Sequence, residues 1–382
     1  MSTQSVPFDE GFSLNSLTAI DGAFSMHEAK KELDALLTML VERGGSDLHI
    51  TAGIAPCMRI NGELRPLEGR DRLLPVDTET LIRSVLSDAM WTKFEASQEL
   101  DTAYALPGVS RFRMNVYRQR GAVGAVMRAI PHKIRSLEEL GLPSSVEQFA
   151  YLPRGLVLVT GPTGSGKSTT LASLLDVANQ SRAGHIVTIE DPIEYLHRHG
   201  KSVVNQREVG SDTADFSVAL KHVLRQDPDI ILVGELRDLE TTSVAVTAAE
   251  TGHLVLATLH TQSAAQTIDR LIDIYPPHQQ QQIRAQLANC LQGVVTQALA
   301  PRKDGMGRTV VVEVMIATSA IRNLIREGKV HQIPSFLQSS AEVGMISFDQ
   351  HLAQLYSEQQ ISKTTGLELA HDPGEFKRLA RI

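Results

Sequence analysis

The segment Gly161-Pro162-Thr163-Gly164-Ser165-Gly166-Lys167-Ser168 matches the pattern GxxxxGK[ST] at every position. An apolar run leads into it, and Thr169 to Asn179 follows with leucines and alanines at helical spacing. Glycines let backbone N–H groups approach phosphates closely, and the N-terminus of the next helix favours negative charge. We therefore predict a strand, a P-loop and a helix that bind ATP through residues Gly161 to Thr169. In this role Lys167 reaches the β- and γ-phosphates, and Ser168 is a ligand of Mg²⁺.

Acidic residues follow two other apolar runs and are candidate partners of the phosphates. Ligands of parallel sheets bind at the carboxyl ends of the strands, where both acidic segments are expected. Glu235 ends the run that starts at Ile230, and we expect it to orient the attacking water and to contact Mg²⁺. Glu190 and Glu194 lie just after the run His185–Ile189, and either is predicted to bind Mg²⁺ or to act as a base. For Asp191, a solvated helix cap is the alternative.

Two histidines bracket the apolar run Leu254–Leu259. His260 falls at the carboxyl end of this predicted strand, so we favour a role in sensing the γ-phosphate. A histidine at a strand end is more often structural, and for His253 the structural and functional interpretations are equally open.

The apolar pattern divides the chain into two domains. Residues 26–130 contain helical periods and alternating strands, for example Phe112, Met114 and Val116 on one face with Arg111 and Arg113 on the other, which predicts a small α+β domain. From Gly155 onward, continuous apolar runs predict an α/β domain with a mostly parallel sheet. The predicted boundaries are a flexible extension at 1–25, the first domain at 26–130, a linker at 131–153, the ATPase domain with a helical C-terminal part at 154–370, and a tail at 371–382.

Composition excludes several classes of protein. Of 382 residues, 4% are aromatic, and the net charge is -7, which disfavours nucleic-acid binding. Only Cys57 and Cys290 are present, too few for a tetracysteine zinc site. The sequence contains no run of eighteen apolar residues, so it predicts no transmembrane helix. The N-terminus lacks the basic residues of a signal peptide. We therefore expect a cytoplasmic protein.

Several segments together resemble one family. In order, Gly161–Ser168, Thr188–Tyr195, Asp229–Glu240 and Thr251–Thr261 are similar to the Walker A, Asp, Walker B and His boxes of the secretion-type hexameric ATPases. Ala320–Glu327 resembles the signature of one branch, the type IV pilus retraction ATPases. The Gly before Glu235, where other P-loop enzymes carry Asp, matches this family's own Walker B form.

The resemblance implies a PAS-like N-terminal domain joined to a RecA-like ATPase domain, assembled as a homohexamer. ATP would lie between the domains, and Arg113 and Arg128 would approach it from an adjacent subunit. On residues alone, a solvated basic face is the better interpretation of these arginines. The implied partners are an inner-membrane pilus platform protein and a paralogous retraction ATPase, with the protein peripheral at the inner face of the cytoplasmic membrane. The signature helix would leave Arg322, Asn323 and Arg326 available for docking.

Four other functions stay open at this stage. The sequence does not separate the main retraction ATPase from its accessory paralogue. An assembly or export ATPase of the same superfamily usually carries a tetracysteine motif, which this chain lacks. A nucleotide-gated regulatory module would use ATP as a switch, and the predicted role of Glu235 argues against it. A DNA translocase is disfavoured by the acidic charge and the few aromatic residues.

Overall fold

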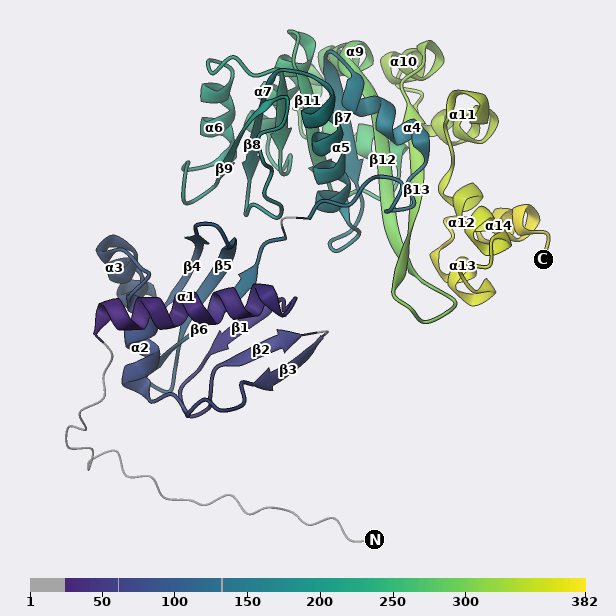
Figure 1. The fold of residues 1–382 in the computed structure, drawn as a ribbon. Coiled ribbons are helices and arrows are strands. Elements are labelled where there is room, and N and C mark those ends of the chain that lie inside the picture. Colours follow the sequence, from purple (N-terminus) through teal and green to yellow (C-terminus); the bar gives the residue numbers. More distant parts are fainter. Residues whose placement is uncertain (1–24, 61, 132) are drawn as a thin grey trace, which may run out of the picture. The chain divides into compact units, whose positions relative to one another are not determined.

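The computed structural model describes residues 25–60, 62–131 and 133–382. These residues form two compact units that divide between Ala129 and Ile130 (Figure 1). The extension predicted at 1–25 lies outside the described residues except for Ser25. No described helix is long and apolar enough to cross a membrane.

The first unit is an antiparallel sheet with helices packed on one face. Described residues form six strands in the order β3-β2-β1-β6-β5-β4. Leucines of the first helix, including Leu33 and Leu37, pack with Phe112, Met114 and Val116 in the core, as the alternation predicts. Element bounds are α1 (Met26–Glu42), β1 (Asp47–Ile50), β2 (Cys57–Ile60), β3 (Glu63–Pro66), α2 (Pro75–Arg83), α3 (Asp88–Ser97), β4 (Glu99–Leu106), β5 (Ser110–Gln119) and β6 (Ala122–Ala129).

One prediction for this unit is wrong, and one strand has no counterpart among the predictions. The sequence predicts one helix over Asp77–Glu95 with Asp77 as its cap, but the structure breaks this segment into α2 and α3, because Ser87 caps a new helix by accepting from the Met90 N–H at 3.3 Å. Asp77 does cap α2, but from its third position, accepting from the Leu74 N–H at 2.8 Å. Strand β4 was not expected at all, since few of its residues are fully buried.

The second unit is built on a mostly parallel sheet. Its seven strands within the described residues have the order β13-β12-β7-β11-β10-β8-β9, and only β13 runs antiparallel to its neighbour. The strands are β7 (Gly155–Thr160), β8 (His185–Glu190), β9 (Val203–Glu208), β10 (Ile230–Val233), β11 (Leu254–Leu259), β12 (Leu291–Pro301) and β13 (Arg308–Ile316). Strands β7, β8, β10, β11 and β13 were predicted, whereas β9 and β12 were not.

Helices cover both faces of this sheet (Figure 1). One face carries α6 (Phe216–Val223), α7 (Leu239–Glu250), α8 (Ala264–Asp273), α9 (Gln280–Cys290), α10 (Ser319–Arg326) and α11 (Ile333–Ser339). The other carries α4 (Ser144–Glu147) and α5 (Lys167–Ser181). The segment predicted as a linker, 131–153, belongs to this second core, because Leu137, Leu142 and Phe149 are buried against it.

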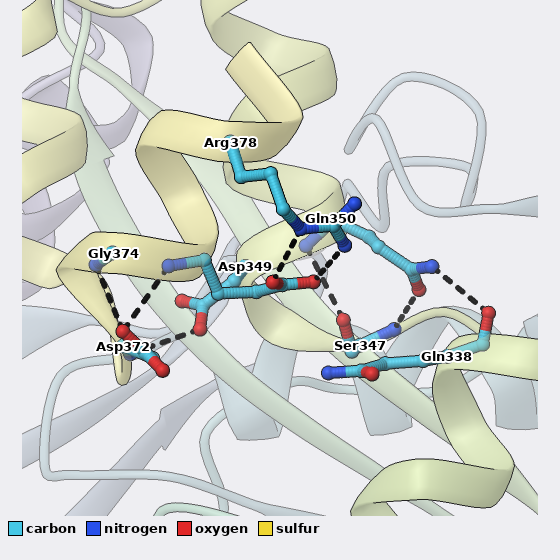
Figure 2. Close-up of polar contacts among 8 residues, drawn as sticks. Gln338, Ser347, Asp349, Gln350, Asp372, Gly374 and Arg378 are labelled. Atoms are coloured by element: carbon cyan, nitrogen blue, oxygen red, sulfur yellow. Dashed lines mark hydrogen bonds and ion pairs between the residues drawn. The ribbon is translucent and has the colours of Figure 1, made fainter. Parts of the chain in front are cut away.

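The C-terminal helices α12 (Phe348–Ser357), α13 (Lys363–Leu369) and α14 (Pro373–Ala380) form a separate cluster packed on β12 and β13. Residues 371–382, predicted as a tail, are mostly helical because Phe376 is fully buried in this cluster. Figure 2 shows how polar contacts join its helices: the carboxylate of Asp349 accepts from the Asp372 N–H at 2.9 Å, and Asp372 caps α14 by accepting from the Gly374 N–H at 2.8 Å.

The outer edge of β13 is covered by the same cluster. The Val312 N–H donates to Nδ1 of His351 at 2.9 Å. Val314 forms a two-way backbone bridge with Ile346, at 2.9 and 3.2 Å. Burial lowers the pKa of His351 to about 4, so the ring stays neutral and able to accept.

Candidate active site

The carboxyl ends of four parallel strands meet at one edge of the second sheet. β10 pairs with β8 and β11, and β11 pairs with β7. The P-loop follows β7, Glu190 ends β8, Glu235 comes two residues after β10, and His260 follows β11 directly. These elements border one cavity of about 580 Å³. Of the predicted residues, its lining includes Thr163, Gly164, Gly166, Lys167, Ser168, Thr169, Glu190, Glu235 and His260.

The P-loop backbone takes conformations that favour glycine. Gly164 and Gly166 have φ of +77° and +92°, in the left-handed region. Gly161 passes so close to β12 that a Cβ atom there would lie 2.1 Å from the carbonyl oxygen of Gln297. α5 begins at Lys167, directly after this turn, so the N–H groups of its first turn are available to an anion.

Lys167 is nearly buried in this cavity. Its Nζ atom donates to the carbonyl oxygens of Gly161 and Pro162 at 2.8 and 3.0 Å. Burial lowers the pKa of the Lys167 ammonium, and the charge of Glu235 opposes the shift. A desolvated cation beside the loop backbone is well placed to stabilise phosphate charge.

Glu235 is held by two cationic or potentially cationic neighbours. One carboxylate oxygen pairs with Nη2 of Arg237 at 2.7 Å, and the other lies 3.1 Å from Nε2 of His260. Partial burial favours the neutral acid, but the hydrogen bond from Arg237 and the charges of His260 and Arg237 outweigh it, so the pKa of Glu235 is lowered. Gly234 lets the strand tips approach, because a Cβ atom there would lie 3.2 Å from the Ile189 carbonyl oxygen.

Glu190 sits in a different environment from Glu235. Its Oε1 atom accepts from the Thr188 hydroxyl at 2.6 Å and from the Gln206 amide at 3.2 Å. Burial raises the pKa of Glu190 despite these bonds. The two carboxyls therefore differ in charge preference, with Glu235 favoured as the anion and Glu190 shifted towards the neutral acid.

The two histidines lie at opposite ends of β11. His260 lines the cavity, whereas His253 precedes the strand and its Nδ1 lies 3.0 Å from the Ala248 carbonyl oxygen at the end of α7. This contact supports the structural interpretation of His253.

Arg113 and Arg128 belong to the first unit and are direct cross-strand neighbours on β5 and β6. Both are exposed, and like charges directly opposite one another destabilise a sheet, but Asp47 on β1 lies opposite Arg128 on its other side and offsets its charge. Arg128 Nε donates to the buried carboxylate of Asp47 at 2.7 Å. Their predicted approach to ATP from an adjacent subunit stays a prediction.

Some residues of the cavity were not found by sequence reasoning. Arg237 lies two residues after Glu235 and could have been noticed there, since it belongs to the Walker B segment. Arg308 and Leu299 come from the β12–β13 hairpin, whose first strand was not predicted. Gln206, which bonds Glu190, comes from the unpredicted β9. Leu299, Arg308 and Gln206 reach the site through strand pairing, which no local motif encodes.

The sequence predicts a helix for the signature segment with Ile321, Leu324 and Ile325 inward. The segment forms α10, and these three residues are buried. The expectation that Arg322 is available for docking is wrong. Its guanidinium donates to the carbonyl oxygens of Ala317, Ala288 and Asn289 at 2.8, 2.8 and 2.9 Å, and to Gln292 Oε1 at 3.1 Å. The last carbonyls of α9 have no partner within the helix, and Arg322 satisfies them.

Comparison with known proteins now identifies the family. A family model described as Type II/IV secretion system protein matches residues 27–355. The chain belongs to that family. It is 48% identical over 348 residues to the type IV pilus retraction ATPase PilT of Pseudomonas aeruginosa, covering 90% of this chain and 100% of that protein. It is 42% identical over 351 residues to the type IV pilus ATPase PilU of the same organism, covering 92% of each.

A solved structure agrees with these relatives. The crystal structure of the pilus retraction motor PilT with bound ADP superposes with a TM-score of 0.84 at 47% identity, covering 90% of this chain and 98% of that one. The predicted fold class, a RecA-like P-loop ATPase domain after a smaller PAS-like α+β domain, is confirmed, and so is the predicted family. Membership of this secretion ATPase family makes the chain an ATP-hydrolysing enzyme.

Proposed function

We propose that this protein is a homohexameric ATPase motor that powers retraction of type IV pili. The observation that carries the proposal is the shared cavity at the strand ends, where Glu235 lies with the P-loop residues Lys167 and Ser168. A binding module needs only the phosphate cradle. Hydrolysis requires in addition a charged carboxylate close to the γ-phosphate, to orient the attacking water.

Each residue has a role that its environment supports. Backbone N–H groups of the P-loop and of the first turn of α5, up to Thr169 and excepting Pro162, bind the phosphates, and Lys167 stabilises the charge that spreads over the γ-phosphoryl group. Glu235, favoured as an anion, accepts a hydrogen bond from the attacking water and orients it. His260 holds the other side of this carboxylate at 3.1 Å and reports whether the γ-phosphate is present. Arg113 and Arg128 complete the site from a neighbouring subunit.

The donor set also fits Mg²⁺. This ion keeps several waters and takes one or two carboxylates together with substrate phosphates, so it needs no protein cage. Accordingly, the described residues contain no cluster of three or more His, Cys, Asp or Glu that could hold a metal. Ser168 and Glu235 are the candidate ligands, and the ion would neutralise phosphate charge. Glu190 suits this role less well, because burial raises its pKa and Thr188 already donates to it.

The relatives support the choice of retraction among the pilus functions. Identity is higher to PilT than to PilU over similar lengths, so we favour the main retraction ATPase over the accessory paralogue. We propose a cytoplasmic protein that acts at the inner face of the membrane through a platform protein and associates with a PilU-like paralogue. The acidic net charge gives no support to nucleic-acid binding.

A phosphate-release assay tests the catalytic assignment. Glu235→Gln should reduce turnover at least a hundredfold, because an amide neither carries the charge nor orients water in the same way. The variant should still bind ATP and form the ring. Glu240→Gln is the matched control, since Glu240 is exposed on α7, pairs with Lys221 and does not line the cavity. Substantial hydrolysis by Glu235→Gln would overturn the assignment.

A genetic experiment tests the direction of the motor. Deleting the gene should leave cells with more surface pili and without twitching motility, and wild-type protein should restore both. Complementation by Glu240→Gln but not by Glu235→Gln would tie retraction to hydrolysis. If pili vanish in the deletion strain, the protein works in assembly and the retraction proposal fails.

A further inference from the structure

Strand β12 lies next to β7 and packs against the P-loop. It pairs in parallel with β7, and Thr296 lies opposite Thr160, with their hydroxyl oxygens 2.9 Å apart. Gln297 is the next residue, level with the point where β7 ends and the loop begins. The carbonyl oxygen of Gln297 lies so close to Gly161 that a Cβ atom on residue 161 would be only 2.1 Å from this oxygen.

The Gln297 side chain reaches the other end of the same loop. It is 1% exposed, and its Nε2 atom donates to the carbonyl oxygen of Ser165 at 2.7 Å. A Cβ atom on Gly166 would lie 3.1 Å from this Nε2. One residue thus contacts the loop where it starts and where it turns into α5.

Stability alone does not explain a glutamine at this place. Its Oε1 atom is buried and has no hydrogen-bond partner among the residues that the structure describes. A buried acceptor without a donor costs free energy that an apolar side chain of similar length avoids. The benefit of the amide is therefore its one directed bond to the loop.

We propose that Gln297 is a positioning residue that holds the P-loop in its phosphate-binding conformation. This inference rests on the proposed ATP binding. Gln297 does not line the cavity, so it acts on the nucleotide only through the loop backbone. The loop binds the phosphates both before and after hydrolysis, so loss of the Gln297–Ser165 hydrogen bond should lower the affinity for ADP and for ATP to a similar extent. It should also raise KM more than it lowers kcat.

The test uses full-length protein and a fluorescent ADP analogue with Mg²⁺, measuring both the dissociation constant and the number of sites per chain. Gln297→Met keeps the length of the side chain and removes the donor. We expect binding to weaken about three- to tenfold, the effect of one net hydrogen bond, with the number of sites unchanged. Gln292→Met is the control: Gln292 lies on the same strand but away from the cavity, where it donates to the Arg154 carbonyl oxygen and accepts from Arg322, so this variant removes hydrogen bonds of β12 without affecting the P-loop.

Each outcome is decisive. An unchanged dissociation constant overturns the inference, and so does a loss of sites at unchanged affinity, because that result means a purely structural role. If Gln297→Met does not fold, Gln297→Asn takes its place, since the shorter amide cannot span the distance to Ser165. Failure of the wild-type protein to bind the analogue would refute the proposed function itself, whereas normal binding by the wild type and by Gln297→Met refutes only the role of Gln297.

Discussion

Arg322 offers the sharpest test of how the signature helix works. Its side chain joins α10 to the end of α9 through the carbonyl oxygens of Ala288 and Asn289, and it also donates to the Ala317 carbonyl oxygen and to Gln292 on β12. Arg322→Met preserves the apolar stem and removes every one of these bonds. The carbonyl oxygens of Ala288 and Asn289 would then depend on water at a half-buried position, so the free energy of unfolding should fall.

The size of the loss follows from the number and kind of the bonds. A hydrogen bond from a charged donor contributes about 1.5–3 kcal/mol, but solvent at this site replaces part of that value. Burial lowers the pKa of Arg322, which means that desolvation of the cation offsets another part. We therefore expect Arg322→Met to lower the free energy of unfolding by about 2–3 kcal/mol. For a unit of this size the melting temperature would fall by roughly 4–10 °C.

Thermal unfolding of the purified variants measures this effect. Arg326→Met is the matched control, because Arg326 lies on the same helix, carries the same charge and is exposed. Its melting temperature should shift by less than about 2 °C. A motility defect in Arg322→Met should be accompanied by the lower melting temperature. If Arg322→Met melts like Arg326→Met and still abolishes motility, Arg322 acts in docking and our reasoning about α9 is refuted.

Two further changes test the second unit. Burial raises the pKa of Glu313 to about 7 from its ordinary 4.5, so the stability that the neutral acid contributes is present below pH 4.5 and lost as the pH rises through 7. Glu313→Gln should therefore make the urea midpoint of unfolding depend less on pH between pH 5 and pH 8. If the pH dependence of the variant equals that of the wild type, this prediction is wrong. Gly366→Ala would place a Cβ atom 2.2 Å from the ring of Phe376, so we expect α14 to detach. In limited proteolysis, trypsin should then cleave the C-terminus of the variant but not that of the wild type.

The sequence was most informative where chemistry is local. The P-loop, Glu235 and His260 each follow a strand whose apolar run is continuous, so both the element and its carboxyl end could be predicted from neighbouring residues. The helical period around Leu33 was equally clear. These features depend on spacing within one segment.

The missed features depend on contacts between distant segments. Gln297 reaches the P-loop only because β12 pairs with β7, and β12 follows α9 without a turn signal to mark its start. Arg322 looked like an exposed residue of an amphipathic helix, and only the position of the α9 end gives it partners. The break between α2 and α3 was missed because Ser87 could equally have been an exposed residue within one helix.

The closed edge of β13 bears on how copies of this protein can meet. An uncovered edge strand would let the sheet of one copy pair with the sheet of another, and a head-to-tail contact of this kind gives open filaments wherever its rotation does not close. His351 and Ile346 occupy the hydrogen-bonding groups of Val312 and Val314, which removes that route at the antiparallel end of the sheet. Because the His351 ring remains uncharged above about pH 4, the protection persists throughout the physiological range. Copies that meet at this edge must therefore do so through side-chain surfaces and not through backbone pairing with β13.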